Sequence, residues 1–271
     1  MKKAVIMAGG LGTRMRKSTE DKKIKLDEDQ EAVADTGIKA MVPVGRPFLD
    51  YVLSALADAG IREICLVVGP DHGRLREYYG HEVECNRINI DFAVQREPKG
   101  TADAVAAASD FAGDDAFIVL NSDNYYPVDA LMALCSIDGP GLIAFSRDAM
   151  ISDSNVPADR ITSFAVVKTN VDDELCRVIE KPSQAMIDSL PNPVGLSMNC
   201  WRFNPTIFRA CAKIEISTRG EYELTDAVQF CIDELGTTFR VITCNAAVLD
   251  LSRREDIASV KSRLLNVSVQ L

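Results

Sequence analysis

The stretch Lys3-Ala4-Val5-Ile6-Met7-Ala8-Gly9-Gly10-Leu11-Gly12-Thr13-Arg14 joins a short apolar run to a glycine-rich turn. The apolar part, Lys3–Ala8, is typical of a buried β-strand. Glycines directly after a strand permit positive φ and close approach of the backbone, so that N–H groups can face phosphate oxygens. Arg14 and Arg16 strengthen this interpretation, because a guanidinium can bridge two phosphate oxygens. The turn has neither the Gly-Lys-Ser/Thr of a Walker A loop nor the G-x-G-x-x-G spacing, so by itself it indicates a phosphate site only weakly.

Strand-like and helix-like runs alternate through the first half of the chain. Such alternation predicts a parallel sheet with helices on both faces, connected by right-handed crossovers. In open sheets of this kind, ligands bind outside the carboxyl ends of the strands. Three polar segments fall at such ends, namely Gly9–Arg14, Gln95 and Asn121–Asn124. The predicted strands are Lys3–Ala8, Glu63–Val68, Ile90–Gln95 and Ala116–Leu120, and the predicted helices are Phe48–Ala59, Leu75–Tyr79 and Ala102–Ser109.

The second half of the chain is less regular but still mixes strands and helices. It has no fixed-period repeat and no linker rich in proline or serine. We therefore expect a single domain over residues 1–271, an α/β fold of three layers (α/β/α, Rossmann-like) with a mixed, mostly parallel central sheet. The predicted strands of this half are Ile161–Lys168, Arg177–Glu180, Leu196–Phe203, Phe239–Thr243 and Ala246–Leu249, and its predicted helices are Pro205–Ala212, Leu224–Glu234 and Arg254–Leu265.

The composition excludes several classes of protein. A formal net charge of −10 argues against a nucleic-acid or membrane-surface binder, because phosphate polymers favour clustered lysine and arginine. No apolar run approaches the roughly 20 residues of a membrane span, and Ala4–Ala8 is too short for the apolar core of a signal peptide. The eight cysteines form no C-x-x-C pair and stand mostly in apolar runs, which is typical of buried, reduced thiols in a cytoplasmic protein. With only His72 and His81, a histidine-rich metal site is excluded.

One segment, Lys17–Asp35, departs from the pattern of the rest. It is crowded with charges of both signs and has few apolar residues. Because burial of so many charges would be costly, we expect an exposed, mobile excursion and not a core element. Two interpretations remain open: a solvated loop, or an active-site lid that adds Lys22, Lys23 or Lys25 to bound phosphates.

A lysine in a distinctive context follows this segment. Lys39-Ala40-Met41-Val42-Pro43-Val44 has the pattern K-x-x-x-P-V, and the glycine turn has the pattern G-G-x-G-T-R. Together they resemble the opening signature of sugar-phosphate nucleotidyltransferases (NDP-sugar pyrophosphorylases), such as glucose-1-phosphate thymidylyltransferase and mannose-1-phosphate guanylyltransferase. In that family the lysine follows the arginine more closely, whereas here Lys17–Asp35 intervenes. We choose Lys39 because it alone has the Pro-Val context and a predicted helix after it.

Further motifs of the same family follow in order along the chain. Gln95–Ala102 resembles the base-recognition segment Q-x-x-P-x-G-T-A, and Glu180-Lys181-Pro182 matches the sugar-phosphate element E-K-P. Glu221–Ala227 matches E-Y-x-L-T-D-A, and Asp250 falls where the family has its second metal aspartate.

Two of the motifs match imperfectly. Asn121–Asn124 resembles the family's G-D-N strand end with Ser122 in place of the glycine, and Met198–Phe203 only approximates N-x-G-x-Y-x-F. Each motif alone has a plain structural explanation, such as a turn cap for Asp123 or a surface ion pair for Glu180-Lys181. Six motifs in the right order make chance a poor explanation.

The resemblance implies an enzyme that transfers a nucleoside monophosphate from an NTP to a sugar 1-phosphate, releases pyrophosphate and requires Mg²⁺. Residues 1–125 would bind the nucleotide and residues 126–271 the sugar. The implied catalytic residues are Arg14 (for the leaving pyrophosphate), Lys39 (for the α-phosphate) and Asp123, and the implied metal ligands are Asp123 and Asp250. The nucleotide-binding set is Ala8, Gly9, Gly10, Gly12, Thr13, Arg14, Gln95, Gly100, Thr101 and Asp123. The sugar-phosphate-binding set is Asn124, Glu180, Lys181, Asn199 and Trp201.

The choice of substrates is less strongly indicated. An amide can donate and accept at once, so Gln95 could bond the N3–H and O4 groups of a pyrimidine, which favours dTTP or UTP. The alternatives are a GTP donor, a phosphate acceptor that is not a sugar, and a non-catalytic regulatory or scaffold homologue. No hexapeptide repeat follows Asp250, so we expect no fused acetyltransferase domain. Assembly into a homo-oligomer is left open.

Overall fold

The apolar run at the N-terminus forms the central strand of the sheet. In the computed structural model, which describes residues 1–17 and 26–271, β1 (Lys3–Met7) lies between β2 (Glu63–Val68) and β4 (Phe117–Asn121) and is parallel to both. Strand β3 (Asn89–Val94) is parallel to β2 and forms the edge. The predicted parallel arrangement of the first half is therefore confirmed. Among its helices are α1 (Thr13–Arg16), α3 (Phe48–Asp58), α4 (Gly73–Glu77) with the π-helical turn η2 (Tyr78–Glu82), α5 (Thr101–Ala106) and α6 (Ser109–Ala112).

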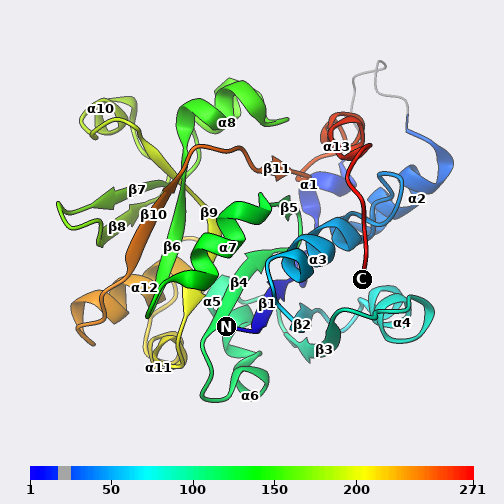
Figure 1. Ribbon diagram of the computed structural model, residues 1–271, viewed down its shortest axis with the longest axis horizontal. Helices are drawn as coiled ribbons and strands as arrows, with labels where there is room; N and C mark the ends of the chain where they lie inside the picture. Colours follow the sequence, from blue (N-terminus) through cyan, green and yellow to red (C-terminus); the bar gives the residue numbers. More distant parts are fainter. Residues whose placement is uncertain (18–25) are drawn as a thin grey trace.

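Beyond β4 the sheet becomes mixed. Strand β9 (Gly195–Phe203) is antiparallel to β4 and to β6 (Gly141–Ser146), and β10 (Arg240–Cys244) is parallel to β6. The order is β10-β6-β9-β4-β1-β2-β3, and the hairpin of β7 (Val166–Thr169) and β8 (Leu175–Ile179) joins β9. Helices cover both faces (Figure 1), which confirms the expected three-layer α/β/α fold with a mixed, mostly parallel sheet. The helices of this half are α7 (Val128–Ser136), α8 (Arg147–Asp153), α9 (Ala158–Ile161), α10 (Gln184–Asp188), α11 (Thr206–Cys211), α12 (Leu224–Asp233) and α13 (Asp256–Leu264).

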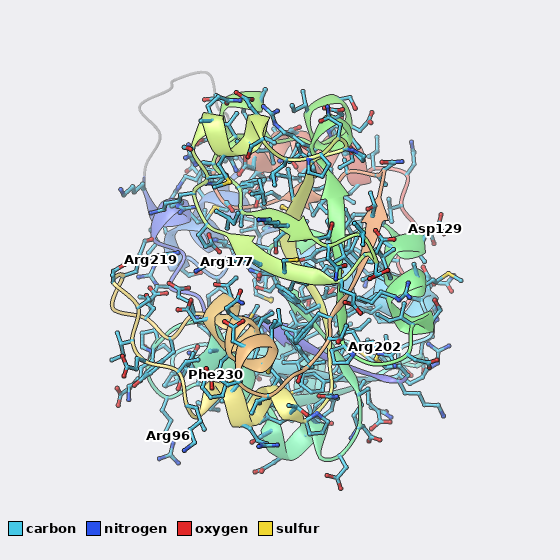
Figure 2. All side chains as sticks on the ribbon, turned by 90° about the vertical axis from the view of Figure 1, so that its left-hand side faces the viewer. Arg96, Asp129, Arg177, Arg202, Arg219 and Phe230 are labelled. Carbon is cyan, nitrogen blue, oxygen red and sulfur yellow. The ribbon has the colours of Figure 1, made fainter. Side chains whose placement is uncertain are left out.

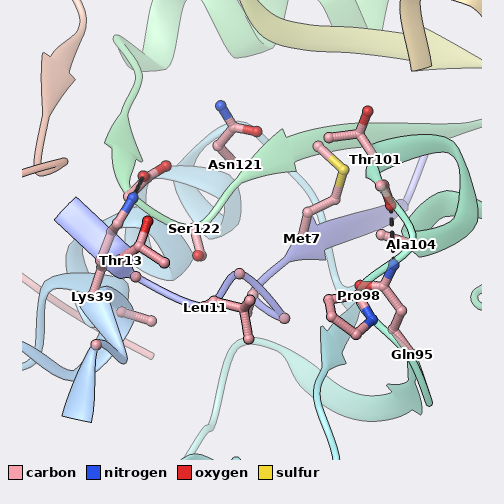
Figure 3. Close-up of a pocket in the computed structure, with 18 of the residues that line it drawn as sticks. Met7, Leu11, Thr13, Lys39, Gln95, Pro98, Thr101, Ala104, Asn121 and Ser122 are labelled. Carbon is pink, nitrogen blue, oxygen red and sulfur yellow. Dashed lines mark hydrogen bonds and ion pairs between the residues drawn. The ribbon is translucent and has the colours of Figure 1, made fainter. Parts of the chain in front are cut away.

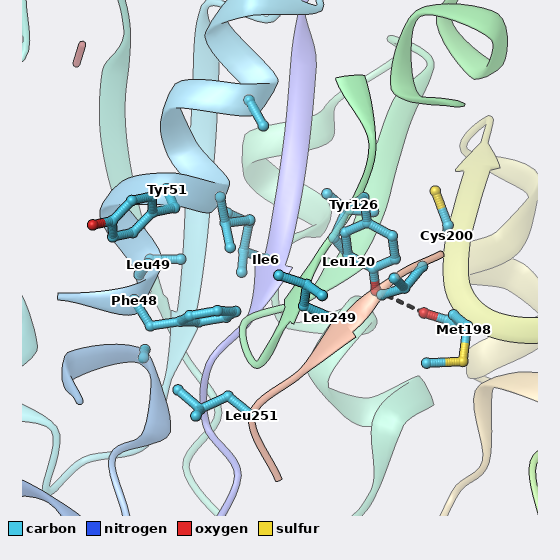
Figure 4. Packing of buried hydrophobic residues seen from close by; sticks show 14 of the residues in the cluster. Ile6, Phe48, Leu49, Tyr51, Leu120, Tyr126, Met198, Cys200, Leu249 and Leu251 are labelled. Carbon is cyan, nitrogen blue, oxygen red and sulfur yellow. Dashed lines mark hydrogen bonds between the residues drawn. The ribbon is translucent and has the colours of Figure 1, made fainter. Parts of the chain in front are cut away.

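The side chains of β1 alternate between two hydrophobic cores. Ala4 and Ile6 pack into the core beneath α3, α7 and α13, whereas Val5 packs into the core beneath α5, α11 and α12. The first core also holds Tyr126, whose hydroxyl donates to the carbonyl of Met198 at 2.6 Å (Figure 4). Because both faces of β1 are covered, its sequence is continuously apolar and does not alternate with polar residues. In the part of the chain that is described, no helix is long and apolar enough to span a membrane.

The charged segment after Arg16 contains a helix that the sequence analysis did not predict. Helix α2 (Glu28–Thr36) begins with a capping box, in which the Asp27 carboxylate accepts from the Gln30 N–H and the Gln30 side chain accepts from the Asp27 N–H. The Gln30 amide also donates to the Pro43 carbonyl at 2.9 Å, and Ala34 is fully buried. The expectation of a loop is therefore wrong for residues 28–35, which form a helix, whereas the expectation that the segment is exposed holds for most of them. Lys22, Lys23 and Lys25, proposed for a lid, lie outside the described residues.

Two further predictions of secondary structure are only partly right. The strand predicted at Ile161–Lys168 begins at Val166, because the residues before it form α9 and a turn. The strand predicted at Ala246–Leu249 is the two-residue strand β11 (Leu249–Asp250), which pairs with β5 (Asn124–Tyr125) in a small second sheet. Elements that were not predicted include β6, α7, α8, α10 and the 3-10 turn η1 (Lys39–Met41).

Candidate active site

The glycine turn and the ends of β1, β3 and β4 surround a cavity of about 420 Å³, which we call the first cavity (Figure 3). It lies outside the carboxyl ends of the parallel strands, where ligands of open α/β sheets bind. The predicted nucleotide-binding residues all line it, with the exception of Arg14. Lys39 lines it too, together with Ser122 and Glu221, which the sequence analysis had not assigned to the site.

Two glycines of the first cavity allow segments far apart in the chain to approach each other. Gly12 has φ +59°, and a Cβ on it would lie 2.0 Å from the Gly37 carbonyl oxygen. Gly100 has φ +120°, and a Cβ there would lie 2.4 Å from the Tyr222 carbonyl oxygen. The N–H of Tyr222 donates to the Lys99 carbonyl at 2.7 Å, so the segment that contains Glu221 docks onto the predicted base-recognition segment. The second half of the chain thus helps to build the wall of the first cavity.

A neighbouring cavity of about 600 Å³, the second cavity, adjoins the first at Asn121, which lines both. Most of the predicted sugar-phosphate residues line it, namely Asn124, Glu180, Lys181 and Asn199, together with Asp250. Arg14, predicted for the nucleotide phosphates, lies here as well. Two of these residues have strained left-handed backbones, Lys181 with φ +46° and Asn199 with φ +53°. Non-glycine residues in this region cost about 1–3 kcal/mol and are found preferentially at functional sites.

Trp201 is the one predicted sugar-phosphate residue that the structure does not bring to the cavity. Its side chain is fully buried in the core beneath α12 and stacks on Phe203, with ring centroids 5.6 Å apart. The indole N–H donates to the Asn199 Oδ1 at 3.2 Å. The assignment of Trp201 to direct sugar binding is corrected accordingly: it holds Asn199, which lines the cavity.

Asp123 and Asp250 lie beside each other where the two cavities meet. Asp123 precedes β5, and Asp250 pairs with Asn124 in the β5–β11 ladder. The Leu251 N–H donates to the Asp123 carbonyl at 2.8 Å, which fixes the two segments side by side. The Lys39 ammonium lies 2.7 Å from Asp123 Oδ2. Burial opposes the charge of Lys39, but Asp123, and to a smaller extent Asp250, more than offsets this and raises the pKa of Lys39 above its usual value.

The carboxylate of Asp250 is held from several sides. Asn124 Nδ2 and Ser252 Oγ donate to Oδ2 at 3.2 and 3.0 Å, and Arg160 Nη2 donates to Oδ1 at 2.9 Å. Arg160 also binds Asp256, with 2.7 Å between Nη1 and Oδ1. Burial and the neighbouring Asp123 raise the pKa of Asp250, while Ser252 and Arg160 oppose this change. The sequence had indicated Asp250 but gave no indication of Arg160.

The chemistry of the two carboxylates at the junction fits a divalent metal ion that keeps other oxygen ligands. Among residues 1–17 and 26–271, no group of three or more histidine, cysteine, aspartate or glutamate side chains is arranged to hold a metal. Mg²⁺ is usually bound through one or two carboxylates together with phosphate oxygens and water, and not in a cage of protein ligands. Asp123 and Asp250, one on each of two adjoining segments, provide that pair of carboxylates.

The arginines near the site make different contacts. Arg16, considered from sequence as a phosphate ligand, donates instead to the Thr36 carbonyl through Nε at 3.0 Å and Nη2 at 2.8 Å. Arg254 donates to the Met15 carbonyl at 2.8 Å and pairs with Asp35, which ties α1 and α2 to the segment after Asp250. Arg219, which was not predicted, lines the second cavity and lies on the same side of the molecule as Arg177 of β8 (Figure 2).

A glycine turn at strand ends and a pair of aspartates between two cavities define a nucleotide-dependent α/β transferase site. Residues 32–260 match the model of the nucleotidyl transferase family, and the chain belongs to that family. Its resemblance to sugar-phosphate nucleotidyltransferases is thereby confirmed, and so is the expectation of an enzyme. Enzymes of this family generally use a divalent metal ion.

Known proteins of similar sequence and structure agree with this assignment. The chain is 30% identical over 273 residues to the UTP–glucose-1-phosphate uridylyltransferase AglF of Haloferax volcanii, with 98% of each protein covered. It is 32% identical over 232 residues to a glucose-1-phosphate thymidylyltransferase of Streptomyces griseus, which covers 85% of this chain but 57% of that relative. The crystal structure of UDP-glucose pyrophosphorylase complexed with UDP-glucose shares the fold, with a TM-score of 0.74, 15% identity, and 99% of this chain and 100% of that one covered.

Proposed function

We propose that this chain transfers UMP or dTMP from UTP or dTTP to a sugar 1-phosphate, with Mg²⁺, and yields an NDP-sugar and pyrophosphate. The observation that carries the proposal is the junction of the two cavities at Asn121, with Asp123 on one side and Asp250 on the other. A transfer between two phosphates requires two anion sites that meet at one point, and positioning of the reactants supplies much of the catalysis.

The first cavity is proposed as the NTP site. Its glycine turn offers backbone N–H groups to phosphates, and Lys39 supplies a cation beside the α-phosphate. Gln95 lies at the far side of the cavity from Lys39 (Figure 3), which supports its proposed role in reading the base. The names of two similar proteins, a uridylyltransferase and a thymidylyltransferase, favour UTP and dTTP as donors.

The second cavity is proposed as the site of the sugar 1-phosphate. Arg14, Lys181 and Arg219 line it together with the carboxylates of Glu180 and Asp250, so the cations outnumber the carboxylates and can bind a phosphate. Glu180 and the amides of Asn124 and Asn199 offer hydrogen-bond partners for hydroxyl groups. In this arrangement Arg14 contacts phosphate groups from the side of the second cavity, at the junction.

The proposed reaction is an in-line displacement at the α-phosphorus. An oxygen of the sugar phosphate forms a bond to that phosphorus, the bond to the bridging oxygen of pyrophosphate breaks, and pyrophosphate leaves with its electron pair. No general base is needed, because the attacking phosphate is already ionised. Mg²⁺, held by Asp123 and Asp250, would neutralise phosphate charge. Lys39 would exchange its partner Asp123 for the α-phosphate, where negative charge needs stabilisation.

A matrix of UTP, dTTP, GTP, CTP and ATP against several sugar 1-phosphates, read by pyrophosphate release, tests the proposal. Asp123→Asn is the matched control, because it keeps the shape of the side chain and removes its charge. We expect release that needs both substrates and Mg²⁺, highest with UTP or dTTP, and lost in the control. Release with GTP tenfold above both pyrimidines would contradict the choice of base, and no release with any pair would contradict the proposed reaction.

Three expectations from the sequence stay predictions. They are the binding of nucleotide by residues 1–125 and of sugar by residues 126–271, homo-oligomerisation, and a cytoplasmic location.

A further inference from the structure

The side-chain amide of Gln95 is held in one orientation. Gln95 follows β3, is only 7% exposed, and lines the first cavity. Its Nε2 donates to the Gly100 carbonyl at 3.0 Å and to Asp103 Oδ2 at 2.8 Å. These two bonds use both hydrogens of the amide nitrogen. Gln95 therefore has no hydrogen left with which to donate to a base, contrary to the expectation that it would donate and accept at once.

The reverse orientation of the amide is disfavoured by its surroundings. Rotation by 180° would place Oε1 against the Gly100 carbonyl and the Asp103 carboxylate, both of which are acceptors. In the observed orientation Oε1 lies on the side of the glycine turn, 3.1 Å from the position that a Cβ on Gly9 would take. Within the described part of the chain, no donor bonds Oε1. The wall of the cavity thus presents a hydrogen-bond acceptor.

We propose that Asp103 is a positioning residue that selects the base, because it fixes Gln95 with Oε1 toward the nucleotide. This inference rests on the proposed function of the first cavity as the NTP site. Uracil and thymine carry an N3–H that can donate to Oε1, and guanine carries an N1–H. Cytosine N3 and adenine N1 are acceptors and would face Oε1 without a proton between them. Asp103 itself does not line the cavity, so it acts only through Gln95.

A purely structural role of Asp103 predicts something different. Asp103 lies in the first turn of α5, where a carboxylate stabilises the helix dipole. Loss of that effect would lower the stability of the protein and its activity with every NTP to the same degree. Selection through Gln95 would change the ratio of UTP to CTP instead, because a fixed Oε1 accepts from the N3–H of uracil, whereas the N3 of cytosine is itself an acceptor.

The test compares kcat/KM for UTP and CTP in the wild type, in Asp103→Asn and in Asp103→Ala, with Asp110→Asn on the exposed start of α6 as the matched control. A site built to bond a substrate N–H rejects analogues that lack it, so we expect wild type to favour UTP by at least about 100-fold. In the Asp103→Asn variant the new amide can turn either its NH₂ or its carbonyl toward Gln95, and this should lower the ratio by at least about tenfold, equivalent to about 1.4 kcal/mol. The alanine variant should lower the ratio in the same direction, and Asp110→Asn should keep the wild-type ratio.

The outcome separates this inference from the proposed function. Wild-type selectivity in both Asp103 variants, with activity toward UTP and CTP reduced equally, would overturn the role of Asp103 while leaving the enzyme intact. If wild type released no pyrophosphate with any NTP, the proposed reaction would fail. Calorimetric titration of the same variants with UTP and with CTP would then still test the selection of the base. A variant that does not fold, judged by circular dichroism, is replaced in this comparison by the other one.

Discussion

The two cavities that meet at Asn121 are built in different ways. The first uses backbone at the ends of parallel strands, with glycines at positions such as Gly12 and Gly100 where positive φ and close approach are required. The second uses side chains from an antiparallel strand and a hairpin, and two of its residues, Lys181 and Asn199, have strained backbones.

This difference suggests how each cavity is specialised. A triphosphate is the same for every NTP, and a rigid cradle of backbone N–H groups suits it. Sugars differ in the positions of their hydroxyl groups, and side chains can be exchanged to match them without a change of fold. Asp123, Asp250 and Lys39, which lie at the junction, are proposed to act on both substrates, so changes there should affect the reaction most.

The largest effect is expected at this junction. Asp123→Asn and Asp250→Asn should each lower kcat by at least about 1,000-fold, or about 4 kcal/mol, because each removes a charge that positions cations on the phosphates. Thermal unfolding should show that both variants remain folded. Activity near that of wild type in either variant, at moderate Mg²⁺, would remove that residue from the metal site.

Replacement of Gly100 should damage the first cavity through its backbone. Gly100→Ala forces a Cβ to within 2.4 Å of the Tyr222 carbonyl oxygen at φ +120°, so we expect a loss of at least about 3 kcal/mol in the free energy of unfolding. Gly10→Ala is the matched control, because a Cβ there meets nothing within 4 Å, and its stability should be unchanged. Urea unfolding measures both; equal stability of the two variants would contradict the packing argument.

Arg160 should matter through the carboxylate that it holds. Arg160→Met leaves Asp250 without its bonded cation, and loss of such a supporting contact typically costs about 10–100-fold in activity or metal affinity. We expect kcat to fall by this amount and the Kd for Mn²⁺ in the presence of UTP, followed by electron paramagnetic resonance, to rise. Arg160→Lys, which keeps the charge, should fall between Met and wild type. A Met variant that binds Mn²⁺ more tightly would mean that Arg160 opposes the metal.

The first cavity could be predicted from the sequence more completely than the second, for a physical reason. Its residues follow strands whose apolar runs are continuous, and a strand end in a parallel sheet defines where a ligand lies. The assignment of Trp201 to direct sugar binding was wrong because its side chain is taken up by the core beneath α12, where it stacks on Phe203, and the sequence of the strand alone does not show which of its aromatic residues that core buries. Arg160 was missed because its partners Asp250 and Asp256 are about 90 residues away, a separation that no local pattern reports.

Helix α2 was missed for a different reason. Its charged composition suggested an exposed loop, but the capping-box pattern of Asp27 and Gln30 was present in the sequence and predicts a helix start. The helix is held by a few buried contacts, among them Gln30 to the Pro43 carbonyl, and not by an apolar face. Composition alone therefore underestimated the order of this segment.

The smallest effect is expected at this cap, away from both cavities. Asp27→Ala removes the acceptor for the Gln30 N–H and should lower the free energy of unfolding by about 1 kcal/mol. Because α2 lies outside the reacting groups, kcat should stay within about twofold of wild type. Thermal unfolding and steady-state kinetics of Asp27→Ala, beside Glu28→Ala as the control for charge, measure both quantities. A large loss of kcat without loss of stability would contradict this expectation and support the interpretation of Lys17–Asp35 as a lid.

One cavity is proposed to bind the NTP and the other the sugar 1-phosphate, and the Michaelis constants of two variants test this division most directly. Gln95→Leu alters only the first cavity and Lys181→Met only the second. Both variants are assayed with UTP and the best acceptor of the substrate matrix. Gln95→Leu should raise the KM for UTP by at least about tenfold and leave the KM for the sugar phosphate within about twofold. Lys181→Met should raise the KM for the sugar phosphate by at least about tenfold and leave the KM for UTP within about twofold. If both variants raised the same KM, or each raised both equally, the division between the two cavities would be wrong.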